Sequence, residues 1–294
     1  MGSMTIGALA RTLRPKQWIK NGFVFAALLF SKKFLDPGSV ISAVAAFISF
    51  CLVTSAVYIL NDLADIEEDR RHPIKSKRPL ASGELAKSTA VIALIAVAAA
   101  GLWLAISVNP YFLLALLSYV ALQVLYTFWL KHVVILDIFS IAAGFMIRVV
   151  AGGLAIGVSI SDWLIICMAL LSLFLAMGKR RHELMLMSHE AASHRPILKE
   201  YSIYLLDQMI SVVTSSTLVA YCLYTISDVT AAKFGTRKLI YTVPFVLYGI
   251  FRYLYLIHKK DSGGSPENLI ISDPPLLVSV FLWILTAAAV ITWK

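Results

Sequence analysis

The chain has 294 residues, of which 59% are hydrophobic and only 15% are charged, and its mean hydropathy is +0.80. A water-soluble domain of this length does not carry so many long apolar runs, so the sequence predicts an all-α, polytopic membrane protein with one domain over residues 1–294. The net charge of +9 suits the cytoplasmic loops of such a protein and gives no reason to expect a nucleic-acid partner. Residues 1–4 have the character of a cloning remnant and are set aside.

A basic, aromatic lead-in precedes the first predicted span. Its sequence is Arg14-Pro-Lys-Gln-Trp-Ile-Lys-Asn21. Lys16 and Lys20 fit either the cytoplasmic membrane boundary or a ligand-binding role, and Trp18 fits an interfacial anchor. About nine helical spans follow, each near the 20 or so apolar residues that crossing a bilayer requires. We place them near residues 20–35, 39–60, 88–107, 111–130, 133–157, 161–178, 205–226, 238–257 and 275–292.

The second predicted span runs into a segment, residues 58–80, that changes from strongly acidic to strongly basic. On a helix, Asp62, Asp65 and Asp69 fall within roughly 60° of one another. Three carboxylates on one face repel each other unless a cation lies between them, and Mg²⁺ takes carboxylates together with substrate phosphates. We therefore predict a Mg²⁺ site at these aspartates, with Lys75 and Arg78 close enough to bind phosphates. The alternative is a solvated helix end that follows the positive-inside rule.

The fourth and fifth spans contribute further polar candidates. Tyr126 and Lys131 end the fourth span, although an interfacial aromatic belt would also explain Tyr126. Asp137 and Arg148 lie within the fifth span, where ionisable groups are expensive and mark functional sites. Asp137 lies near the helix start, where the dipole stabilises it, and Arg148 is about 16 Å further along the axis. The two cannot pair directly, and a carboxylate on another helix is the alternative partner for Arg148.

A second charged cluster, mostly positive, follows the sixth span. It reads Lys179-Arg-Arg-His-Glu183. With nine spans, the N-terminus and the loops near 61–87, 131, 179–200 and 258–273 fall on the side that holds most Lys and Arg. That side is cytoplasmic by the positive-inside rule. We therefore expect both charged clusters at the cytoplasmic face of the cell membrane.

The acidic segment carries a family resemblance. Asn61-Asp62-x-x-Asp65-x-x-x-Asp69, at the cytoplasmic end of a second span, resembles the first aspartate motif of the UbiA superfamily of intramembrane prenyltransferases. Aromatic prenyltransferases of that superfamily carry a second Asp-rich motif after the sixth span, where this chain has the cationic cluster instead. This departure is similar to the decaprenyl-phosphate phosphoribosyltransferase branch. The other segments that resemble this branch are residues 14–21, 72–79, 126–131, 143–153 and 179–183.

The resemblance implies a UbiA-like helical bundle and a Mg²⁺-dependent pentosyltransferase of cell-wall biosynthesis. Such an enzyme transfers 5-phosphoribose from phosphoribosyl diphosphate (PRPP) to a polyprenyl phosphate and releases pyrophosphate. The residues expected to act in catalysis are Asp62, Asp65, Lys131 and Lys179. The residues expected to bind substrates are Lys16, Lys20, Asn61, Lys75, Arg78, Tyr126, Lys131, Asp137, Arg148, Lys179, Arg180 and Glu183.

Two other functions stay open at this point. A prenyltransferase that moves a prenyl group from a prenyl diphosphate to an aromatic or lipid acceptor would use carboxylates in both loops. A transporter would carry its charged residues near mid-span. A homo-oligomer is compatible with the sequence.

Overall fold

The computed structural model describes residues 2–71, 75–189, 196–260, 269–270 and 272–292, and the chain folds into two compact units. The first unit contains the residues up to Ser140 together with Ile147–Ser159. The second contains Ile141–Met146 and the described parts of Ile160–Ala192 and Pro196–Lys294. Eight described helices are long and apolar enough to cross a membrane. The all-α, multi-pass architecture is therefore confirmed, with a span count close to the nine expected.

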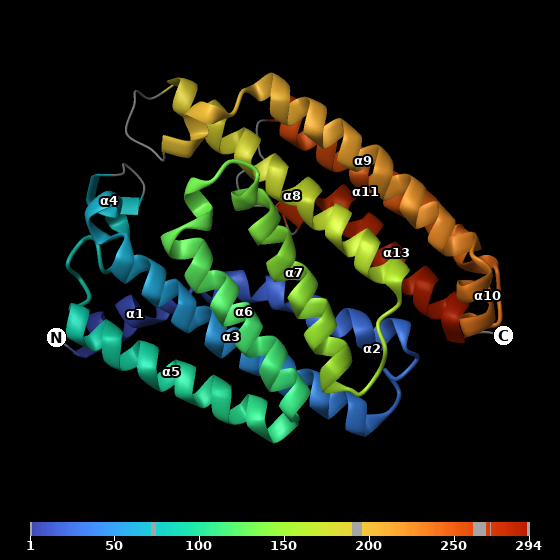
Figure 1. Ribbon diagram of the computed structural model, residues 1–294, viewed down its shortest axis with the longest axis horizontal. Helices are drawn as coiled ribbons and strands as arrows, with labels where there is room; N and C mark the ends of the chain where they lie inside the picture. The colour runs from blue at the N-terminus through green and yellow to red at the C-terminus, as the bar shows by residue number, and fades with distance from the viewer. Residues whose placement is uncertain (1, 72–74, 190–195, 261–268, 271, 293–294) are drawn as a thin grey trace. The chain divides into compact units, whose positions relative to one another are not determined.

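The helices of both units are shown in Figure 1. Several begin at side chains that cap the first free N–H groups: Asp36, Asn109 and Ser202 accept from the backbone three residues on. The first unit contains α1 (Gly2–Leu13), η1 (Pro15–Phe25), α2 (Ala26–Phe30), α3 (Pro37–Ala64), α4 (Ile66–Arg71), η2 (Lys75–Lys77), α5 (Lys87–Val108), α6 (Pro110–Phe128), η3 (Leu130–His132) and most of α7 (Leu136–Ala155). The second contains α8 (Asp162–His189), η4 (Pro196–Glu200), α9 (Ile203–Ile226), α10 (Asp228–Phe234), η5 (Lys238–Thr242), α11 (Val243–Lys259) and α13 (Pro274–Thr292).

The segment expected as the first span, residues 20–35, is not one α-helix. It lies in the 3-10 helix η1 and the five-residue α2. Residues three apart share one side of a 3-10 helix, so Trp18, Asn21 and Val24 lie on the same side of η1. Trp18 Nε1 donates to Ser55 Oγ at 3.0 Å, Asn21 Nδ2 donates to Thr54 Oγ1 at 3.2 Å, and Val24 is fully buried. Packing against α3 thus explains why this segment departs from the sequence-based expectation.

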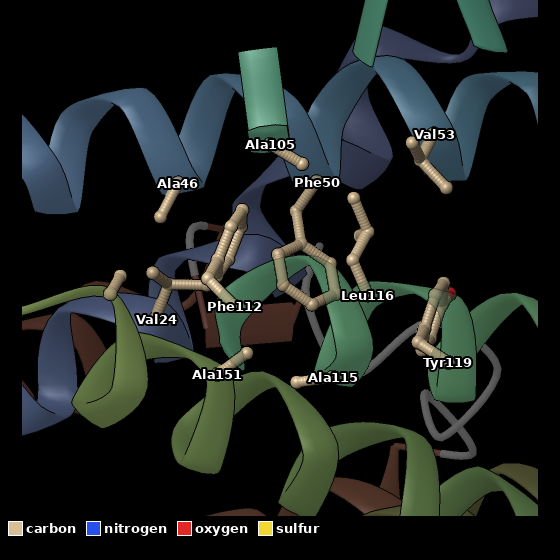
Figure 2. Packing of buried hydrophobic residues seen from close by; sticks show 11 residues of the cluster. Val24, Ala46, Phe50, Val53, Ala105, Phe112, Ala115, Leu116, Tyr119 and Ala151 are labelled. Atoms are coloured by element: carbon tan, nitrogen blue, oxygen red, sulfur yellow. The ribbon is translucent and has the colours of Figure 1, made fainter. Parts of the chain in front are cut away.

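Aromatic rings fill the centre of the first unit. Figure 2 shows Phe50 of α3 beside Phe112 and Tyr119 of α6. The ring of Phe50 lies 5.9 Å from that of Phe112 and 5.5 Å from that of Tyr119, both edge to face. Gly152 of α7 approaches η1 so closely that an added Cβ would lie 2.0 Å from the Val24 carbonyl oxygen. This close approach of two backbones positions η1 against α7.

The second unit is built on two helix pairs, α8 with α9 and α11 with α13. A chain of hydrogen bonds crosses its interior: Trp283 Nε1 donates to Tyr221 Oη at 2.7 Å, and this hydroxyl is 2.6 Å from Thr242 Oγ1. Polar groups at membrane depth need such internal partners because lipid offers none. These bonds connect α9, η5 and α13.

Candidate active site

The acidic segment keeps the path of a helix across a small break. Helix α3 ends at Ala64 and α4 begins at Ile66. The N–H of Asp65 still donates to the Asn61 carbonyl at 2.9 Å, and the N–H of Asp69 donates to the Asp65 carbonyl at 2.8 Å. The aspartates therefore follow nearly the helical spacing that the sequence predicts. Two of them, Asp62 and Asp69, are only 2% exposed.

One guanidinium joins these two buried carboxylates. Arg78 Nη1 lies 3.1 Å from Asp62 Oδ1 and 2.6 Å from Asp69 Oδ2. Lys75 Nζ lies 3.9 Å from the other oxygen of Asp69. Charges buried to this degree are stable only when they are paired and hydrogen-bonded. The predicted neighbourhood of the aspartates with Lys75 and Arg78 is thus present, and Arg78 occupies the position between two carboxylates.

Arg14 is a site residue that we did not assign from the sequence. Its guanidinium forms an ion pair with Asp62 and lies 4.9 Å from the centre of the Tyr58 ring. Its backbone is left-handed, with φ 52° and ψ 57°, directly before Pro15. This conformation costs roughly 1–2 kcal/mol for a residue with a side chain, and proline disfavours helical backbone before it. Burial lowers the pKa of Arg14 below its usual value, and the Asp62 carboxylate offsets part of this effect.

The connection between α6 and α7 supplies another cation. Lys131 is buried, and its Nζ lies 2.9 Å from Asp65 Oδ1. On the same side, the Thr127 hydroxyl is hydrogen-bonded to the Asn61 side chain. The structure therefore brings Asn61, Asp65 and Lys131 together across 66 residues of sequence.

The three aspartates do not converge on one point, because Asp65 pairs with Lys131 while Asp62 and Asp69 share Arg78. Within the described residues, no three His, Cys, Asp or Glu side chains form a ready-made group of metal ligands. Mg²⁺ needs less, because it is commonly held by one or two carboxylates plus substrate phosphates. Asp62 and Asp69 fit that requirement, since an oxygen of each lies within hydrogen-bond distance of Arg78 Nη1, so the two carboxylates are close enough to share one cation.

The remaining predicted residues of the first unit have varied surroundings. Lys16 is exposed on η1, and Lys20 and Tyr126 are half-buried. Asp137 is fully buried in the first turn of α7.

Arg148 is buried as well: its Nε donates to Asn21 at 2.9 Å and its Nη2 donates to Tyr119 Oη at 2.8 Å. Arg148 therefore connects α7 with η1 and α6. Of the segment 72–79, residues 72–74 lie outside the described part of the chain.

The cationic cluster belongs to the second unit. Lys179 is half-buried, while Arg180 is 1% exposed and forms an ion pair with Glu183 one turn on. Arg181 donates to Asp207 at 2.6 Å and to the Ile257 carbonyl at 3.1 Å, which connects α8 with α9 and α11. A common membrane face for this cluster and the aspartates stays a prediction.

Known proteins align with almost the whole of this chain. The UbiA prenyltransferase family matches residues 22–285. Decaprenyl-phosphate phosphoribosyltransferase of Corynebacterium glutamicum is 34% identical over 281 residues, covering 94% of this chain and 84% of that protein. The protein of the same name from Mycobacterium tuberculosis is 32% identical over 297 residues, covering 98% and 95%.

Solved structures agree on the fold. A UbiA homolog from Archaeoglobus fulgidus bound to GPP and Mg²⁺ has a TM-score of 0.72 at 19% identity, covering 97% of this chain and 99% of that one. A digeranylgeranylglyceryl phosphate synthase has a TM-score of 0.67 at 18% identity, covering 97% and 99%. The aspartate motif across α3 and α4, the membrane helices and the similarity along almost the whole sequence lead to one conclusion: the chain belongs to the UbiA prenyltransferase family.

Proposed function

We propose that this enzyme transfers 5-phosphoribose from PRPP to a polyprenyl phosphate and releases pyrophosphate, at the cytoplasmic face of the cell membrane. Two relatives named for decaprenyl phosphate and phosphoribosyl transfer align with 94% and 98% of the chain, which supports this substrate pair. The observation that carries the proposal is the charge arrangement around the aspartates. Three carboxylates lie in ion pairs with four cations, namely Arg14, Lys75, Arg78 and Lys131.

A magnesium diphosphate needs both signs of charge in one place. Asp62 and Asp69 would hold Mg²⁺, which neutralises the charge that develops on the departing diphosphate. Arg78 and Lys75 donate charge-assisted hydrogen bonds to diphosphate oxygens, and Asp65 keeps Lys131 oriented for the same task. Because Lys131 is already held by its ion pair with Asp65, it needs little reorganisation at the moment of reaction.

The chemistry asks little more of the protein than positioning. The bond between the ribose anomeric carbon and the diphosphate breaks through an oxocarbenium-like state. An oxygen of the polyprenyl phosphate attacks from the opposite face, which inverts the configuration and gives a β-linked product. A phosphate monoester, with a second pKa of about 6, is already an anion near neutral pH, so no strong general base is required. Lys179 is proposed to hold the 5-phosphate or the lipid phosphate, and the lipid tail lies among apolar helices.

The experiment measures transfer of radiolabel from PRPP into the lipid fraction. Purified protein in detergent receives Mg²⁺, a polyprenyl phosphate and PRPP, and the organic phase is counted. We expect labelled lipid that disappears with EDTA and in Asp62→Asn and Asp69→Asn. The matched control is Asp228→Asn, the same change in an exposed ion pair of the second unit. Absence of labelled lipid with wild-type protein, together with turnover of a prenyl diphosphate and an aromatic acceptor, would reject the proposal.

A further inference from the structure

Asp62 and Asp69 are paired mainly with arginines, while Lys75 lies further off, 3.9 Å from Asp69. Both carboxylates are almost fully buried, and Arg78 contacts both while Arg14 contacts Asp62. We propose that Arg78 and Arg14 are exchangeable counter-cations: they neutralise the aspartates until a divalent metal takes their place, and they then bind the substrate's phosphates. Metal and diphosphate are thereby loaded together. This inference rests on the proposed function for the identity of the diphosphate.

Arg78 occupies a position for which a metal must compete. A single nitrogen lies within hydrogen-bond distance of one oxygen of each aspartate. A metal held by Asp62 and Asp69 would therefore compete with the Arg78 guanidinium for the same two carboxylates. Two cations so close repel each other strongly at the low effective dielectric of a buried site. The Arg78 side chain is 29% exposed, so its guanidinium has room to turn toward a bound phosphate.

Arg14 depends on the charge of Asp62 in a different way. Its left-handed backbone before Pro15 is unfavourable, and the ion pair with Asp62 and the contact with the Tyr58 ring offset this cost. Neutralising Asp62 with a metal removes the main electrostatic reason for that position. The Arg14 side chain is 26% exposed, so its guanidinium can also reach an anion from outside the protein.

Displacement of the arginines by the metal makes the binding of metal and diphosphate cooperative. A metal that arrives alone must displace arginines that then have lost their carboxylates, so it binds weakly. A diphosphate that arrives with the metal gives those arginines new anionic partners, so each ligand strengthens the other. Linkage requires this coupling to be reciprocal. The arginines therefore oppose binding of the metal alone and favour binding of the diphosphate, two effects of opposite sign from the same side chains.

The test measures metal binding with no phosphate present. Mn²⁺ is titrated into wild type, Arg78→Gln and Arg14→Gln, and free Mn²⁺ is read by EPR. Asp62→Asn defines binding elsewhere on the protein. Removing a positive charge a few ångströms away should tighten Mn²⁺ binding by about tenfold or more. The same variants should raise the KM for PRPP by at least about tenfold. Arg78→Lys, which keeps the charge, should bind Mn²⁺ much as wild type does.

A merely structural arginine would give a different result, because its loss would damage the aspartates and weaken Mn²⁺ and PRPP together. Equal or weaker Mn²⁺ binding in both glutamine variants overturns the inference. If Arg78→Gln does not fold, Arg14→Gln still decides, since Arg78 remains to neutralise both aspartates. Arg237→Gln, in an exposed ion pair, is the charge-matched control and should change neither constant. Tighter Mn²⁺ binding by the glutamine variants, together with no PRPP turnover by the wild type, supports the exchange and rejects the proposed substrate. PRPP turnover by the wild type, together with unchanged Mn²⁺ affinity in the glutamine variants, supports the proposed substrate and rejects the exchange.

Discussion

Gly152 offers the sharpest test of how the fold positions the site. A Cβ added here would lie 2.0 Å from the Val24 carbonyl oxygen and 2.9 Å from its carbonyl carbon. The obstacle is backbone, so no side chain can swing aside, and α7 and η1 must separate by about 1 Å or more. Overpacking of this kind costs typically about 1–3 kcal/mol. The helix propensity of alanine returns up to about 1 kcal/mol. An approach of 2.0 Å to a backbone atom belongs at the upper end of that range, so for Gly152→Ala we expect a net loss of about 2 kcal/mol.

The same displacement should reach the site through η1. Asn21 on η1 accepts from Arg148, and Arg14 immediately precedes η1 and contacts Asp62. We therefore expect Gly152→Ala to lower kcat/KM for PRPP as well as stability. Stability is read as the melting temperature in detergent by intrinsic tryptophan fluorescence.

The control is Gly249→Ala, also inside a helix, where an added Cβ comes no closer than 3.9 Å to a neighbouring side chain. Here the alanine should be neutral or should stabilise by roughly 0.4–1 kcal/mol, because it restricts the unfolded chain. Equal melting temperatures for the two variants would refute the packing argument, and normal kcat/KM in a destabilised Gly152→Ala would refute the connection to the site.

Three further predictions concern charged side chains that ion pairs or hydrogen bonds hold in place. Lys131→Ala should abolish most turnover and lower stability by about 1–3 kcal/mol, because it strips Asp65 of its partner; Lys131→Arg should recover part of both, and full activity in the alanine variant would contradict the assignment. Arg148→Met should destabilise the first unit in thermal melts more than it changes the KM for PRPP, and a changed KM at unchanged stability would make Arg148 a ligand. The hydrogen bond from Arg252 holds the pKa of Asp273 below its usual value, so Asp273 stabilises the fold above its unfolded pKa, near 4, and this stability is lost as the pH falls through the lowered pKa. Asp273→Asn should therefore melt lower than wild type at pH 6, by a difference that shrinks as the pH falls below about 4, and a constant difference would contradict this.

The sequence by itself determined the membrane architecture. Long apolar runs leave a chain little choice in lipid, because every backbone polar group must be satisfied within its own helix. It also located the acidic segment and the cations that follow it, since the 3.6-residue period places Asp62, Asp65 and Asp69 near one face wherever that helix packs.

Only the tertiary structure decided which cation each aspartate receives. Asp65 pairs with Lys131 across 66 residues and Asp62 pairs with Arg14 across 48 residues. No local rule connects such partners, because their distance depends on how α1, α3 and α6 pack.

Tertiary packing also overrides local backbone preference in residues 14–25. Anchored to α3 through Trp18 and Asn21, residues 15–25 become a 3-10 helix rather than the start of a span, and Arg14 adopts a backbone that its own sequence, before a proline, disfavours. Side-chain charge and hydropathy are properties of the residues themselves, whereas the partition of charge within a buried cluster is a property of the whole packed chain.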